Sequence, residues 1–178
     1  MWSRASDKRA ASWEAAVLSL LACLIGGCAR RTGEEVSWRA FEPPEGGYTV
    51  LLPGEPKYVP TSDGMAAWGT AVGGQMAFLT SYVTIPEEPG LTARGRLQQA
   101  ARQASRQGRV LQRRRLKLAG LEGLELIVED DEEQVTAYRW YLGDRRFYQL
   151  LALVPKRRYG AEDPLLATFF DSFRLLRR

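Results

Sequence analysis

Two segments of this chain are apolar on both sides of an extended backbone, and they constrain the fold more than any other sequence feature. The first is QMAFLTSYVTI, residues 75–85, which divides its apolar side chains between two faces: Met76, Phe78 and Tyr82 on one, Leu79, Val83 and Ile85 on the other. The second is FYQLLALV, residues 147–154, which is apolar at nearly every position. Because a strand that is apolar on both faces has to be covered on both, we expect a sheet between two layers, with residues 147–154 in a central strand.

Turn residues divide the rest of the chain into further short strands. Residues 48–52 place alternate apolar side chains on one face of a strand, which ends at Pro53-Gly54 because proline cannot donate to a sheet ladder. Asp63-Gly64 and Gly73-Gly74 indicate two tight turns. The second half of the chain predicts four consecutive strands, at about 109–118, 122–129, 134–142 and 145–154.

Two helices are predicted between and after these strands. Thr92 has the character of a helix cap, and the helix is expected to run to about Gln107 and to stop at Gly108. Its buried stripe is thin and consists of Leu97, Ala100, Ala101 and Ala104. A last helix opens at Asp163-Pro164, since proline is tolerated at the first helical position. Its buried face is expected to comprise Leu165, Leu166, Phe169, Phe170 and Phe173.

The N-terminal residues are typical of an export signal. A positive start precedes the apolar run Ala15–Ile25, which has the length of a signal-peptide core and is shorter than the roughly 20 residues that cross a bilayer. The run ends in LIGGC, residues 24–28, which resembles the lipobox of bacterial lipoproteins, where the cysteine is acylated and the chain is cut before it. A plain secretory signal and a buried N-terminal helix are the alternatives that the residues leave open.

The lipobox resemblance implies a division of the chain into three regions and a location in the cell. Residues 1–27 would be a lipoprotein signal peptide, residues 28–37 a tether lipidated at Cys28, and residues 38–178 the folded domain. Two or more acyl chains anchor a protein stably, and the polar tether spans roughly 30 Å when extended. We therefore expect an exported protein held at the periplasmic or outer face of a bacterial membrane by its N-terminal lipid.

The composition excludes several kinds of chemistry. The chain contains no histidine, which excludes Ser-His-Asp and Cys-His catalysis and histidine-ligated metal sites. Its two cysteines are Cys23, inside the predicted signal peptide, and Cys28. The acidic run Glu129–Glu133 lacks the spacing of a calcium-binding loop. We predict no catalytic, cofactor-binding or metal-binding residues and a protein that is not an enzyme.

Charge is distributed unevenly along the second half of the chain. Residues 92–117 contain nine basic side chains and no acidic one, whereas residues 122–133 contain seven acidic ones. If the two segments form a hairpin, basic and acidic side chains pair across it and set the strand register. The alternative is a basic surface that binds an acidic partner or anionic lipid. For this basic surface we name Arg102, Arg106, Arg113 and Arg115. Nucleic acid is not expected as a partner of an exported protein.

Three segments also resemble the PsbP-like family of small exported bacterial domains. They are WRAFEPPEGGYTVLLPGEP (residues 38–56), RWYLGDRRFYQLLALVP (139–155) and FFDSFRL (169–175), and the resemblance covers about residues 37–178. It implies an α+β fold, a curved antiparallel sheet of about six to eight strands with helices on both faces. The shared features are structural, and the bacterial group is largely without assigned activity.

The sequence therefore supports two hypotheses for the function. The first is a membrane-anchored, non-enzymatic binding or assembly module of the cell envelope, with an envelope protein as its partner. The alternative is a small-molecule carrier or sensor whose pocket lies between the sheet and the alanine-lined helix at 92–107. Large aromatic residues opposite small ones motivate this alternative, although such residues are by default part of a core.

Overall fold

The structure, a computed structural model, describes residues 36–61, 65–85, 92–143, 145–160 and 164–176. Cys28, the predicted signal peptide and most of the predicted tether lie outside these ranges. The elements in chain order are β1 (Trp38–Phe41), β2 (Tyr48–Pro53), β3 (Lys57–Pro60), β4 (Ala66–Val72), β5 (Met76–Thr84), α2 (Ala93–Ala104), η1 (Ser105–Gln107), β6 (Arg109–Leu118), β7 (Leu121–Glu129), β8 (Gln134–Leu142), β9 (Arg146–Pro155), η2 (Lys156–Arg158), α3 (Pro164–Asp171) and β10 (Arg174–Leu175).

Seven strands form one antiparallel sheet in the order β3-β4-β5-β9-β8-β7-β6. The strand that contains residues 147–154 is β9, and it lies at the centre of the sheet, as the sequence predicts. The four consecutive strands expected in the second half of the chain are β6 to β9. Gly73 and Gly74 adopt positive φ angles of 58° and 68° in the turn between β4 and β5. The other expected turn, Asp63-Gly64, lies outside the described residues.

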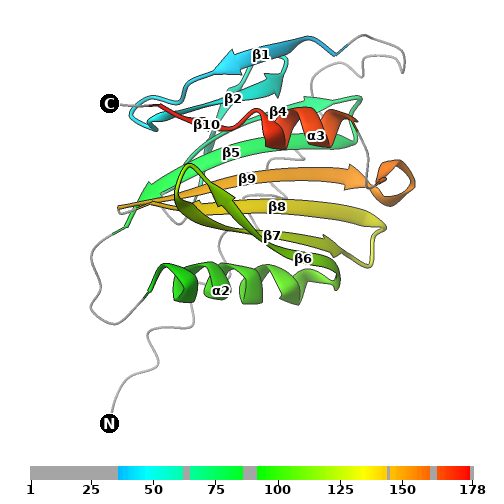
Figure 1. The fold of residues 1–178 in the computed structure, drawn as a ribbon. Coiled ribbons are helices and arrows are strands. Elements are labelled where there is room, and N and C mark those ends of the chain that lie inside the picture. Colours follow the sequence, from blue (N-terminus) through cyan, green and yellow to red (C-terminus); the bar gives the residue numbers. More distant parts are fainter. Residues whose placement is uncertain (1–35, 62–64, 86–91, 144, 161–163, 177–178) are drawn as a thin grey trace.

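The sheet is covered on both faces, with α2 on one side and α3 on the other (Figure 1). Two separate hydrophobic cores result, and β5 shows how they divide. Met76 and Phe78 belong to the core beneath α3, whereas Ala77 and Leu79 belong to the core beneath α2. The α+β fold with helices on both faces is confirmed.

A second, smaller sheet was not expected from the sequence. Strands β1, β2 and β10 form it, in the order β1-β2-β10. The last described strand pairs with the first half of the domain, because Arg174 lies opposite Thr49 and Leu175 opposite Tyr48. This sheet lies beside α3 on the same side of the seven-stranded sheet (Figure 1). It closes the α3 core with Tyr48, Val50 and Leu52, all at most 1% exposed.

Helix α2 begins after Thr92 as predicted but ends at Ala104, and the short 3-10 helix η1 continues the chain to Gln107, where the predicted helix was expected to end. The Thr92 side chain accepts a hydrogen bond from the Gly95 backbone at 3.1 Å and caps the helix. Ala101 and Ala104 are fully buried, and with Leu97 they form the contact with the sheet. Because these side chains are small, the helix axis lies close to the strands.

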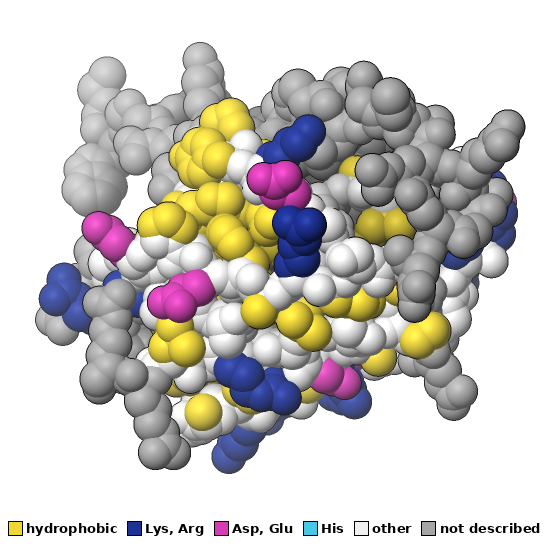
Figure 2. Space-filling view, turned by 90° about the horizontal axis from the view of Figure 1, so that it is seen from above, with side chains coloured by type: hydrophobic (Ala, Val, Ile, Leu, Met, Phe, Trp, Pro, Cys, Tyr) yellow, Lys and Arg dark blue, Asp and Glu magenta, His cyan; other side chains and the backbone are white. Residues whose placement is uncertain are grey.

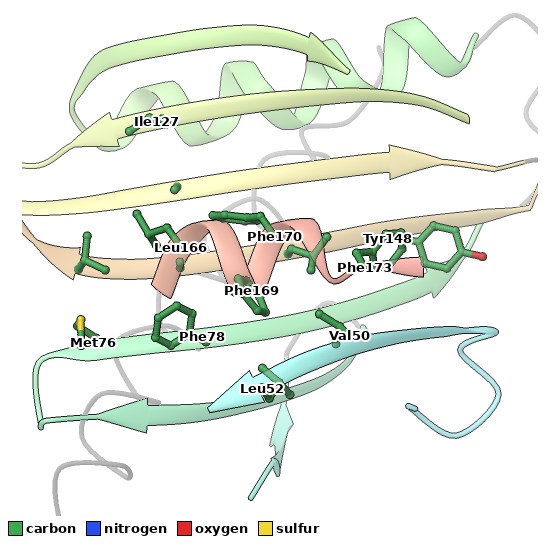
Figure 3. Close-up of a cluster of buried hydrophobic side chains, with 14 of the residues drawn as sticks. Val50, Leu52, Met76, Phe78, Ile127, Tyr148, Leu166, Phe169, Phe170 and Phe173 are labelled. Atoms are coloured by element: carbon green, nitrogen blue, oxygen red, sulfur yellow. The ribbon is translucent and has the colours of Figure 1, made fainter. Parts of the chain in front are cut away.

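Aromatic rings dominate the α3 core (Figure 3). Phe169 lies 5.3 Å from Phe78 and 5.0 Å from Phe170, measured between ring centroids. Phe173 was expected on the same helix, but α3 ends at Asp171 and Phe173 lies after it, directly before β10. Its ring is still buried, at 5.0 Å from that of Tyr48.

The first prediction concerns the stability of this core. Replacing Phe169 with alanine removes a fully buried ring and leaves a cavity, so we expect Phe169→Ala to lower the free energy of unfolding by about 3–5 kcal/mol. The matched control is Tyr58→Ala, because the Tyr58 side chain is 62% exposed; its loss should stay below about 1 kcal/mol. Urea denaturation followed by tryptophan fluorescence measures both, and equal losses would contradict the described core.

Candidate functional site

In the hairpin of β6 and β7, the basic residues of β6 lie on both faces of the sheet. Arg114 lies opposite Glu125 on the α3 side, where Leu116 also packs against the α3 core. Arg113 and Arg115 point to the other side of the strand, towards α2. The charged segment predicted from the sequence is therefore two different surfaces.

One extra residue in β6 makes this sorting possible. The register of the hairpin shifts between Val110 and Gln112, where Leu111 is inserted as a bulge. Arg109 and Arg114 are an odd number of residues apart, which would normally place them on opposite faces of the strand. With the bulge between them, both arginines lie opposite glutamates that share one face of β7.

The first of these glutamates forms a network on the α3 side. Glu125 is 5% exposed and accepts hydrogen bonds from Arg139 Nε at 2.6 Å and from Gln112 Nε2 at 2.9 Å. Arg114 Nη2 lies 3.0 Å from the same carboxylate. Arg139 also binds Asp171 of α3 through Nη1 at 2.7 Å. Three strands and a helix are thus joined around one buried carboxylate.

The second glutamate is paired near the other end of the hairpin. Glu129 Oε2 lies 2.6 Å from Arg109 Nη2, and Glu129 Oε1 lies 2.5 Å from Lys156 Nζ. The hydrogen bonds from Lys156 and Arg109 hold the pKa of the Glu129 carboxyl below its usual value. The cross-strand pairing that the sequence suggested is therefore present for Arg109 and Arg114.

The two arginines of the other row of β6 have no acidic residue directly opposite them, whereas Lys117, the next residue of this row, lies opposite Glu122. Arg113 lies opposite Leu126, and Arg115 lies opposite Leu124. Arg113 donates a hydrogen bond to Gln98 Oε1 of α2 at 2.6 Å, which is a neutral acceptor. This contact places the exposed row of β6 next to one side of α2.

The two remaining residues of the basic surface come from the other side of this contact. Arg102 follows Gln98 by one helical turn and lies on the same side of α2, and Arg106 continues in η1. Both are exposed. Within the described ranges, none of the four arginines of the basic surface takes part in an ion pair. The structure thus brings Arg102, Arg113 and Arg115 onto the α2 side of β6 and leaves Arg106 exposed where η1 extends α2.

The face of the molecule remote from α2 carries side chains of both charges. Figure 2 looks onto the molecule from above, where basic, acidic and hydrophobic side chains are interspersed.

The acidic run Glu129–Glu133 has a structural role in the turn between β7 and β8. Asp130 Oδ1 accepts hydrogen bonds from the backbone of Glu132 and Gln134. Among the described residues, no three acidic or cysteine side chains lie close enough to hold a metal ion. None of the described helices is long and apolar enough to cross a membrane.

A groove of about 270 Å³ lies on the α3 side of the sheet. Its lining comes from β6, β8, α3 and the segment after α3: Arg114, Leu116, Lys117, Leu118, Arg139, Tyr141, Phe170, Asp171, Phe173 and Arg174. The sequence placed a pocket at the alanine-lined helix instead, between α2 and the sheet. There Ala101 and Ala104 pack directly against the strands, and the rings of Tyr138 and Trp140 stack within the same core.

Arg139 is the central residue of the α3 side that sequence reasoning missed. It lies on β8 between Tyr138 and Trp140, in a strand whose side chains are mostly buried. Its guanidinium lies 4.8 Å from the centre of the Phe170 ring. An arginine inside an apolar strand, with a glutamate inside the neighbouring one, was the available signal.

Comparisons with known proteins bear on the fold alone. No family model matches this chain, and no curated protein matches its sequence. Among solved structures, the chain is similar to the solution structure of cyanobacterial PsbP (CyanoP) from Synechocystis, with a TM-score of 0.59 and 13% sequence identity over 84% of this chain and 99% of that chain. The chain has a PsbP-like fold. This confirms the fold that three short sequence segments suggested for the PsbP-like domain.

The second prediction uses the lowered pKa of Glu129. Because the pKa is lower in the folded chain, the ionised carboxylate stabilises the PsbP-like domain near neutral pH, and this contribution is lost as the pH falls through the folded-state pKa. We expect Glu129→Gln to be less stable than the wild type at pH 7, and the difference to shrink on acidification. Denaturant titrations at several pH values measure it.

Glu132→Gln is the matched control for this experiment, because Glu132 lies exposed in the turn between β7 and β8. Its stability should follow that of the wild type at every pH. A difference between wild type and Glu129→Gln that grows as the pH falls would contradict the ion pairs at this position.

Proposed function

We propose that this protein is a lipid-anchored, non-enzymatic binding module of the bacterial cell envelope. Its lipid is attached at Cys28, after removal of residues 1–27, and its partner is an envelope protein with an acidic surface. The basic surface of Arg102, Arg106, Arg113 and Arg115 binds this partner. The lipobox-like sequence supports the anchor, and the charge distribution of β6 supports the docking surface.

One observation supports the docking surface: glutamates pair with the arginines of one row of β6, whereas the arginines of the other row form no ion pair with any described residue. Arg109 and Arg114 are held by glutamates, whereas Arg113 and Arg115 face leucines. Unpaired cations that share one side of a protein give that side a positive potential, which accelerates association with acidic partners and disfavours basic ones.

The position of β6 agrees with a docking role. It is an edge strand of the seven-stranded sheet, and its side chains are exposed over most of its length. Arginines along an edge oppose pairing with the same strand of a second copy, because like charges would meet. The edge therefore remains accessible to a partner of opposite charge.

The third prediction tests the docking surface on the full chain in its membrane. Arg102→Glu with Arg115→Glu reverses two charges of the basic surface, and neither side chain has an ion-pair partner within the described part of the chain. We expect recovery of a crosslinked envelope partner to fall by about tenfold or more. Crosslinking in membranes followed by quantitative mass spectrometry measures this recovery.

The control is Arg39→Glu with Arg158→Glu, which changes the net charge equally at exposed positions of β1 and η2. It should recover the partner as the wild type does. A third variant, Cys28→Ser, should keep residues 1–27 and carry no lipid, which mass spectrometry of its N-terminus measures. Equal recovery with both charge-reversal variants would exclude the basic surface as the docking site, and a wild-type chain that keeps residues 1–27 or carries no lipid at Cys28 would exclude the lipid anchor.

A second candidate function is a small-molecule carrier or sensor. The groove beside α3 favours it, since its volume of about 270 Å³ approaches that of ligand pockets and it combines aromatic rings with charged groups. The two functions use opposite faces of the sheet, so one chain can carry both.

A further inference from the structure

We infer that the groove beside α3 binds a small organic anion, a carboxylate or phosphate that carries an apolar group. The inference rests on the second proposed function, that of a carrier or sensor, and is independent of the docking surface. Three features of the groove support it: a rigid aromatic base, a surplus of positive charge, and guanidinium nitrogens that make no hydrogen bond to any described residue.

The aromatic base exists because one position of β7 has no side chain. The Tyr141 ring lies over Gly123, and a Cβ atom at Gly123 would be 2.7 Å from a carbon of that ring. Tyr141 stacks in parallel on Phe173, with ring centroids 5.2 Å apart and an angle of 2° between the planes. Both rings are almost fully buried, so they form a rigid base beneath the groove, and the apolar surface that a ligand can contact comes from the partly exposed Leu116 and Leu118.

The aromatic base itself contributes no charge. Burial raises the pKa of the Tyr141 hydroxyl, which therefore stays neutral at physiological pH. Leu116 and Leu118 of β6 form the opposite apolar wall. The recognition of a charged ligand must then come from the side chains around the rim.

Three arginines and one carboxylate line the groove. The arginines are Arg114, Arg139 and Arg174, and the carboxylate is Asp171. Even when the adjacent Glu125 is counted with Asp171, positive side chains outnumber negative ones by one. A concave site with a positive surplus attracts anions.

Two of these arginines retain guanidinium nitrogens for a ligand. Arg114 bonds to Glu125 through Nη2, and Arg174 bonds to the carbonyl oxygens of Asp171 and Phe173 through Nη1. The other two nitrogens of each guanidinium make no hydrogen bond within the described residues. A guanidinium can donate two parallel bonds to a carboxylate or phosphate.

Arg139 has a different part in the groove. Its Nε and Nη1 are bound to Glu125 and Asp171, and its guanidinium lies over the Phe170 ring. It therefore fixes the positions of both carboxylates, and this leaves Arg114 and Arg174 to contact the ligand.

The fourth prediction compares two probes that differ only in charge. Titration calorimetry of the purified full chain, in non-ionic detergent with matched blanks, measures binding of 2-naphthoate and of the neutral 2-naphthamide. We expect 2-naphthoate to bind about tenfold more tightly, because a hydrogen bond to a charged group is stronger than one to a neutral group. Arg114→Gln with Arg174→Gln should abolish this preference.

Two further variants make the outcome decisive. Arg102→Gln with Arg106→Gln removes the same charge from the opposite side of the sheet and should retain the preference. Leu116→Trp places a large ring in the groove and should weaken both probes. All variants are first checked for a cooperative unfolding transition that lies well above the temperature of the titration.

The results separate the inference from the function on which it rests. Equal binding of both probes, blocked by Leu116→Trp, would overturn the anion preference and leave the carrier function standing. Absence of binding by either probe would overturn both. A preference for 2-naphthoate that survives Arg114→Gln with Arg174→Gln would also overturn the inference, since the anion would then bind elsewhere.

Discussion

Side chains alternate between the two faces of each strand in the seven-stranded sheet, and both cores and both candidate sites depend on this alternation. In β5 it divides one apolar segment between the α2 core and the α3 core. In β6 it divides one basic segment between a paired and an unpaired row. The same geometric rule thus determines what is buried and which charges remain available.

The bulge at Leu111 sets the phase of this alternation in β6. Because the extra residue precedes Gln112, Arg114 reaches Glu125 while Arg109 still reaches Glu129. Bulges are frequent at sheet edges, where they change the direction in which side chains point. Here the bulge places the glutamates that pair with Arg109 and Arg114 on the α3 side of the hairpin.

Local patterns predicted most of the fold. Thr92 as a helix cap and the apolar run at 147–154 are signals carried by neighbouring residues, and the elements that they predict are present. The small sheet of β1, β2 and β10 was not predicted, because β10 is two residues long and pairs with β2, more than a hundred residues earlier. No periodicity within so short a strand can indicate such a partner.

The candidate site was predictable only in part, for the same physical reason. The basic segment was visible in the sequence, but the assignment of Arg113 and Arg114 to opposite faces depends on the hairpin register and its bulge. The groove depends on Gly123 and Tyr141, which belong to adjacent strands and meet only through their pairing. Long-range register, which sequence patterns specify weakly, therefore decides where the charges and the groove lie.

The most direct test of this account compares two adjacent arginines of β6. The account predicts that Arg114→Glu, which places a second negative charge beside the buried Glu125, lowers the free energy of unfolding by about 1 kcal/mol or more. Arg115→Glu, on the unpaired row, should change it by less than about 0.5 kcal/mol. Equal destabilisation by the two substitutions, measured by chemical denaturation, would contradict the sorting of charges on which both proposed sites depend.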